Sequence, residues 1–126
     1  MSRKRILIID DESDIREIAK LSLTLTKQWD VLTASSGEEG GNIASEFQPD
    51  AILLDLIMPQ LGGLDTLKLL KENKNTVGIP VVLLTATAKL AMKAEYTHWG
   101  ARGILVKPFD PGTLGDQIEE LLAWGY

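Results

Sequence analysis

The chain of 126 residues contains no cysteine, which excludes disulfide bonds and thiolate metal sites. No apolar run approaches the roughly 20 residues that a membrane-spanning helix needs, and the first residues do not follow the pattern of a secretory signal. Basic residues are outnumbered by acidic ones, 13 to 18. Their only cluster is Arg3-Lys4-Arg5, and the net charge is -5, whereas a nucleic-acid surface needs a basic face. We therefore expect a cytoplasmic protein with no membrane insertion and no direct nucleic acid binding.

Short apolar runs alternate with longer segments of helical period, a pattern that is typical of βα units and a parallel sheet. The length suits one compact core, so residues 1–126 are predicted to form a single domain. The runs are apolar throughout, which indicates strands covered by helices on both faces. The prediction is a doubly wound α/β fold with five strands and five helices. The helices are expected around residues 13–25, 38–47, 64–72, 89–99 and 111–122.

The second of these helices is predicted to be weak, because Gly40 and Gly41 each cost about 1 kcal/mol relative to alanine in a helix interior. The fourth is expected to end at Gly100, which suits a C-terminal cap.

Polar residues stand at or just after the ends of four apolar runs. They are Asp10 and Asp11 after 6–9, Asp55 after 51–54, Thr85 after 81–84, and Lys107 after 104–106. Each has an ordinary explanation when taken alone, as a helix cap, a loop acid, a strand hydroxyl or a solvated turn. These explanations do not account for five such residues at the carboxyl edge of one sheet, where doubly wound folds bind their ligands.

The chemistry of this cluster follows from its charges. Carboxylates only a few Å apart raise one another's pKa unless a cation lies between them. Ligation by oxygen alone favours Mg²⁺, a hard cation that commonly combines carboxylates with phosphate oxygens. Beside such an ion and the Lys107 ammonium, Asp55 would stay ionised and attack phosphorus, giving an aspartyl phosphate. Lys107 and the Thr85 hydroxyl would then contact the phosphoryl oxygens.

Four motifs resemble those of the receiver domain of two-component response regulators, and the resemblance extends over essentially the whole chain. The motifs are Asp10-Asp11-Glu12, Leu54-Asp55-Leu56-Ile57-Met58-Pro59, Leu84-Thr85-Ala86 and Val106-Lys107-Pro108-Phe109. The resemblance implies a flavodoxin-like sheet of strand order 2-1-3-4-5 and a cis peptide between Lys107 and Pro108. It also implies a phosphohistidine donor on a sensor histidine kinase or a phosphotransfer protein.

The resemblance further implies a ligand set for Mg²⁺. Asp11 and Asp55 would bind the ion directly, Asp10 would act partly through water, and the backbone carbonyl of Ile57 would complete the protein ligands. Such a receiver is not a metabolic enzyme: it catalyses only its own phosphorylation on Asp55 and its dephosphorylation.

Several positions depart from the family pattern. Ile104 stands where receivers often carry Tyr or Phe, so the usual aromatic switch is missing. Ile57 and Thr87 occupy two variable positions that influence hydrolysis in the family, and an apolar Ile57 cannot orient water. We therefore predict a long-lived phosphoryl group. Gly62 replaces the family's common aspartate, with no effect expected on the site. Trp99 replaces a small residue; burial in the core is favoured over an exposed anchor for a partner, and His98 is expected at the surface.

Three functions are considered for such a chain. The first is a phosphorylation-driven switch that changes its choice of downstream partner, with a possible homodimer through the face between the fourth and fifth helices. The second is a phosphorylation-independent interaction module, favoured by Ile104 but opposed by the intact acidic, threonine and lysine positions. The third, flavin binding, has no glycine-rich phosphate loop. The ends of the chain favour a stand-alone receiver over a fragment of a longer regulator without deciding between them.

Overall fold

The sheet has five parallel strands, seen in a computed structural model that describes residues 3–58, 62–86 and 95–124. Their spatial order is β2-β1-β3-β4-β5, as predicted. The strands are β1 (Arg5–Ile9), β2 (Asp30–Ala34), β3 (Ala51–Asp55), β4 (Val81–Thr85) and β5 (Gly103–Val106). Every residue of β3 and β4 is buried, which explains why their sequences are apolar throughout rather than alternating.

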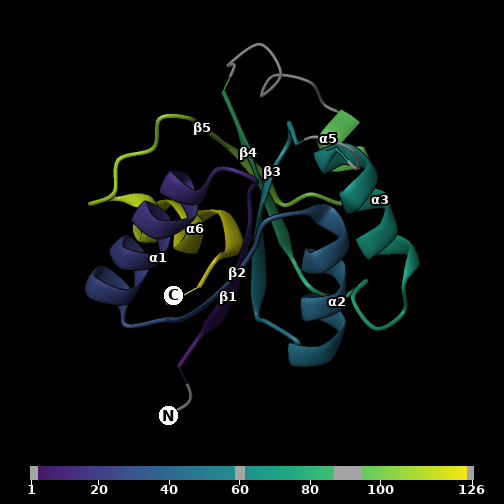
Figure 1. Cartoon of the computed structure of the whole chain (residues 1–126), viewed down its shortest axis with the longest axis horizontal. Helices are drawn as coiled ribbons and strands as arrows, with labels where there is room; N and C mark the ends of the chain where they lie inside the picture. Colours follow the sequence, from purple (N-terminus) through teal and green to yellow (C-terminus); the bar gives the residue numbers. More distant parts are fainter. Residues whose placement is uncertain (1–2, 59–61, 87–94, 125–126) are drawn as a thin grey trace.

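Helices cover both faces of the sheet (Figure 1). They are α1 (Ser13–Lys27), α2 (Gly37–Phe47), α3 (Gly63–Glu72), α5 (Glu95–His98) and α6 (Leu114–Leu122). One apolar cluster joins α1 and α6 to one face of the sheet, and a second joins α2 and α3 to the other face. The α/β architecture predicted from the sequence is thus confirmed.

The helix count differs slightly from the prediction. The described residues contain four helices of nine residues or more, together with the four-residue α5. The expected helix over 89–99 falls partly on residues 87–94, which lie outside the described residues. Its end is confirmed in the described part, because Gly100 has a φ of 98° and its N–H bonds to the Thr97 carbonyl at 3.0 Å.

The glycine pair Gly40-Gly41 does not prevent α2 from forming, although the sequence predicted a weak helix there. The helix forms over its full predicted length, and the Ser36 side chain caps it by accepting a hydrogen bond from the Glu39 N–H. At Gly40 the backbone lies so close to Ile9 that a Cβ atom would collide with its side chain. At Gly41 a Cβ atom would meet nothing within 4 Å. One glycine is therefore required by packing and the other is not.

The prediction that Trp99 is buried is wrong. Its side chain is 37% exposed, and it lies under the ammonium of Lys68, whose Nζ is 4.0 Å from the ring centroid. The packing partner is a cation on α3 rather than the apolar core, so an aromatic ring at this position can stay in water. His98 is exposed, as expected.

Within the described residues, no helix is long and apolar enough to cross a membrane.

Candidate functional site

The carboxyl ends of β1, β3, β4 and β5 bring the predicted site residues together. Asp10 follows β1, Asp55 and Thr85 end β3 and β4, and Lys107 follows β5. Asp10 and Thr85 are fully buried, and Asp55 is 4% exposed. Asp11 lies at the surface beside them. Parallel strands end at the same edge, so residues far apart in the chain become neighbours there.

Local backbone contacts fix the position of each side chain. The Lys107 N–H donates to the Thr85 carbonyl at 2.6 Å, which ties the ends of β5 and β4 together. The Asp10 side chain accepts the Glu12 N–H at 2.9 Å, and the Asp55 side chain accepts the Ile57 N–H at 3.3 Å. Both acids are thereby held at the first turn of the loop that follows their strand. The peptide bond between Lys107 and Pro108 is cis, as predicted.

Gly63, the first residue of α3, lies directly against the loop that follows Asp55. Its N–H donates to the Leu56 carbonyl at 3.0 Å, and a Cβ atom at Gly63 would collide with the Asp55 carbonyl and with Leu56 Cα. Only glycine permits this approach. The start of α3 and the loop after Asp55 are therefore in backbone-to-backbone contact.

The three acids form a group that fits a divalent cation. Asp10, Asp11 and Asp55 each offer a carboxylate oxygen, and these atoms lie within 4.8 Å of one another. In the described part of the chain, Asp10 Oδ2 is buried and accepts no hydrogen bond, although it lies within ion-pair distance of Lys107. Buried carboxylate oxygens normally have a partner. A donor set made only of carboxylate oxygens, one of them buried with no hydrogen bond, suits a hard cation.

Lys107 supplies the positive charge on the other side of the group. Its Nζ lies 3.1 Å from Asp10 Oδ2, 3.2 Å from Glu12 Oε1 and 3.5 Å from Asp55 Oδ1. Burial by itself would lower the pKa of Lys107, but Asp10, Asp55 and Glu12 together outweigh it and raise the pKa above its ordinary value. The ammonium is therefore charged at neutral pH and lies within reach of any group bound to Asp55.

Asp55 itself is held in an unfavourable environment for a carboxylate. Burial, followed by repulsion from Asp10, raises the pKa of Asp55 to about 6, while attraction from Lys107 and the Ile57 N–H oppose this shift. A cation between the acids would act in the same sense as Lys107 and favour the ionised form. Desolvated and only partly neutralised, the Asp55 oxygen is suited to nucleophilic attack.

Two contacts in the site were not predicted from the sequence. Glu12 shares the Lys107 ammonium, and the Arg16 guanidinium donates to the Asp10 carbonyl at 2.8 Å. Arg16 lies on the first turn of α1, shortly after Asp10 and Asp11. This closeness in the sequence was the only indication that Arg16 contacts the site. Ile57 is 63% exposed, with its side chain turned to solvent. Thr87 and Pro59 lie outside the described residues.

Comparison with known proteins agrees with this geometry. The sequence profile of the response regulator receiver domain matches residues 6–119. The chain belongs to the response regulator receiver family. Among solved structures, this receiver is similar to the Vibrio cholerae chemotaxis protein CheY4, with a TM-score of 0.87 and 29% identity over 95% of this chain and 99% of that one.

Curated relatives give the same result. The receiver is 37% identical over 119 residues to the Synechocystis sp. "DNA-binding dual master transcriptional regulator RpaA", covering 94% of this chain and 46% of that protein. It is 33% identical over 122 residues to the phosphate regulon regulatory protein PhoB of Pseudomonas aeruginosa, covering 97% of this chain and 53% of PhoB. The chain thus spans about half the length of these relatives.

Proposed function

We propose that residues 1–126 form one receiver that takes a phosphoryl group onto Asp55 in a Mg²⁺-dependent reaction. The observation that carries the proposal is the buried group of Asp10, Asp55 and Lys107, in which Asp10 Oδ2 accepts no hydrogen bond and has the ammonium, 3.1 Å away, as its ion-pair partner. Asp11 and Asp55 would bind the ion directly, Asp10 partly through water, and the Ile57 carbonyl would complete the protein ligands. The ion would neutralise charge on the transferred phosphoryl group.

The protein's own residues define the transfer. Asp55 Oδ forms a bond to phosphorus while the bond from phosphorus to the donor nitrogen or oxygen breaks, and the leaving group takes up its proton from solvent. Lys107, already 3.5 Å from Asp55, pairs with the phosphoryl oxygens, and the Thr85 hydroxyl contacts another of them. The receiver catalyses this transfer and the later hydrolysis of the aspartyl phosphate, in which water releases inorganic phosphate and restores the Asp55 carboxylate, and no other reaction is assigned to it.

The donor would be a phosphohistidine on a sensor histidine kinase or a phosphotransfer protein. Beside the site, α1 exposes three apolar side chains at helical spacing, Ile18, Leu21 and Leu25. These three side chains form an apolar stripe that faces solvent rather than the core. We propose that this stripe receives the donor. A homodimer through the face between the fourth and fifth helices stays a prediction, because much of that face lies outside the described residues.

The test is phosphorylation by acetyl phosphate, followed as a mass increase on intact protein with and without Mg²⁺, together with beryllofluoride binding. The wild type should be modified only when Mg²⁺ is present, and Asp55→Asn should stay unmodified. A wild type that does not respond in either assay would reject the proposal. That outcome would support the phosphorylation-independent interaction module, which Ile104 at the usual aromatic position favours.

The lifetime of the product is a separate prediction. Because Ile57 offers no side chain that can orient water, the phosphoryl group should persist longer in the wild type than in Ile57→Glu, whose carboxylate could hold a water. Decay of labelled protein after removal of acetyl phosphate measures this. Equal decay in the two proteins would contradict the role given to Ile57.

A further inference from the structure

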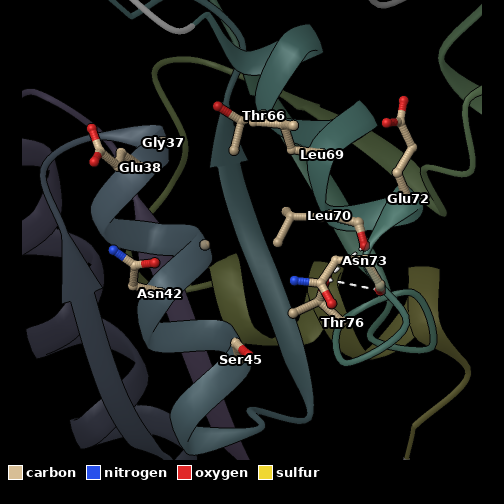
Figure 2. A pocket seen from close by; sticks show the side chains of 11 residues that line it. Gly37, Glu38, Asn42, Ser45, Thr66, Leu69, Leu70, Glu72, Asn73 and Thr76 are labelled. Carbon is tan, nitrogen blue, oxygen red and sulfur yellow. Dashed lines mark hydrogen bonds between the residues drawn. The ribbon is translucent and has the colours of Figure 1, made fainter.

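A groove separates α2 from α3 on the side of the sheet away from α1 (Figure 2). Its volume is about 430 Å³. Leu69 and Leu70 of α3 form its apolar wall, and Leu69 is 54% exposed. The opposite wall contains Gly37 and Gly41, where no side chain closes the gap. The groove therefore exists because the α2 wall has glycine where a larger residue would fill the space.

The charge of the groove has one sign. Among the described residues that line it, the charged ones are Glu38 on α2 and Glu72 on α3. An adjoining hollow along α2 adds Glu39 and Glu46. The α2 sequence contains no lysine or arginine at all. A negative potential therefore follows the length of α2.

The two lysines of α3 are not among the residues that line the groove, because both ammonium groups are held outside it. Lys68 lies over the Trp99 ring, and Lys71 donates to the carbonyls of Val77 and Ile79 at 3.2 and 2.9 Å. Burial, followed by repulsion from Arg102, lowers the pKa of Lys71. The groove keeps its acidic character even though basic residues are present on the same helix.

We propose that this groove, between α2 and α3, docks a basic, apolar peptide segment of a partner protein. An apolar side chain would enter against Leu69 and Leu70, and flanking lysine or arginine residues would pair with Glu38 and Glu72. The amides of Asn42 and Asn73 lie along the groove and can bond to peptide backbone. The same negative charge disfavours nucleic acid and anionic membranes. The site is distinct from Asp55, and binding there does not require phosphorylation of Asp55.

The binding assay uses the full chain and two fluorescein-labelled probes, an amphipathic leucine/lysine peptide and its leucine/glutamate counterpart. Anisotropy at physiological salt should show saturable binding of the basic peptide and none of the acidic peptide. Equal binding of both peptides, or of neither, would overturn the proposal. So would binding of a labelled oligonucleotide that the basic peptide displaces.

A matched pair of substitutions tests the location. Gly41→Leu should fill the groove and weaken binding about tenfold or more, while Gly41→Ala leaves the groove open and should change affinity less than about twofold. Both residues favour helix over glycine and neither meets a nearby atom at Cβ, so both proteins should fold, with Tm raised by a few degrees. Equal affinity of the two variants would place the peptide elsewhere and reject the groove.

A second pair separates a specific contact from general charge attraction. Glu38→Gln with Glu72→Gln should weaken binding about fivefold or more, whereas Glu17→Gln with Glu120→Gln, on α1 and α6, carries the same net charge and should change it little. Equal losses would mean net charge alone attracts the peptide, and the proposal would fall. Asp55→Asn should bind like the wild type, so failure of the phosphorylation proposal would leave this result unaffected.

Discussion

Charged side chains are exposed and paired at the amino end of the sheet, but buried and only partly neutralised at its carboxyl end. At the amino end, Arg5 donates through Nε to Asp30 at 2.9 Å and through Nη1 to the Phe47 carbonyl at 3.2 Å, and its backbone N–H bonds to Asp50 at 2.8 Å. These groups are half exposed and complementary. At the carboxyl end, Asp10 and Asp55 are buried side by side with one shared ammonium.

The difference separates what stabilises the fold from what performs chemistry. Exposed pairs such as Arg5 with Asp30 are worth little but cost little. Burial of a carboxylate is costly, and repulsion between two buried carboxylates adds to that cost; the raised pKa of Asp55 reflects both effects, burial first and Asp10 second. The acids at the amino end are half exposed, whereas at the carboxyl end one ammonium is shared by two buried carboxylates, and this incomplete neutralisation marks the carboxyl end as the functional one.

The strongest test of the comparison is Asp55→Asn. Phosphorylation should be lost completely, while the free energy of unfolding at pH 7 without Mg²⁺ should rise by about 1 to 3 kcal/mol, because a buried charge is removed. Urea titration measures the second effect. If Asp55→Asn were inactive and also less stable than the wild type, the buried charge of Asp55 would not be destabilising the fold.

Lys107→Met should slow labelling by acetyl phosphate about a hundredfold, because one donor to the phosphoryl group is lost from a buried site. It should also lower stability, since Asp10 and Asp55 lose their shared counter-charge. Lys20→Met on the exposed face of α1 is the control and should label normally. Normal labelling of Lys107→Met would remove the lysine from the mechanism.

The ionisation of Asp55 should contribute to the way the free energy of unfolding changes with pH. Its folded pKa of about 6 lies above the ordinary value of 3.8, so the folded state binds more protons between these values, and stability should fall as pH rises from about 4 to about 6. The loss attributable to Asp55 is at most about 3 kcal/mol. Subtracting the free energy of unfolding of Asp55→Asn from that of the wild type at each pH isolates the contribution of Asp55. Adding Mg²⁺ at pH 7 should restore much of the loss in the wild type, and a flat difference across this range would refute the assignment.

The smallest effect is expected at the amino end. Arg5→Ala should lower the free energy of unfolding by about 1 kcal/mol and leave the rate of labelling unchanged, because its partners are half exposed and far from the site. Thermal unfolding and the acetyl phosphate assay measure both quantities. A large change in labelling would show that the two ends are not separate in function.

The sequence predicted the sheet and the site because both depend on local pattern. Apolar runs define the strands, and the residues that follow them must meet at one edge once the strands are parallel. The sequence did not predict that Gly40 and Gly41 differ, since only the packing of α2 on Ile9 distinguishes two identical neighbours. Nor did it predict that Trp99 lies under Lys68 or that Glu12 shares Lys107, because these contacts join side chains that are distant in sequence or depend on rotamer.

The contact at Gly63 joins the two sites discussed above. α3 forms one wall of the groove, and its first residue touches the backbone on either side of the Asp55 to Leu56 peptide with no side chain between them. Such a contact has no rotamer with which to absorb a displacement. Any coupling it carries is reciprocal by thermodynamic necessity: a peptide that binds the phosphorylated receiver about tenfold more tightly would shift the phosphorylation equilibrium by the same factor. A partner in the groove would then influence the signal it reads.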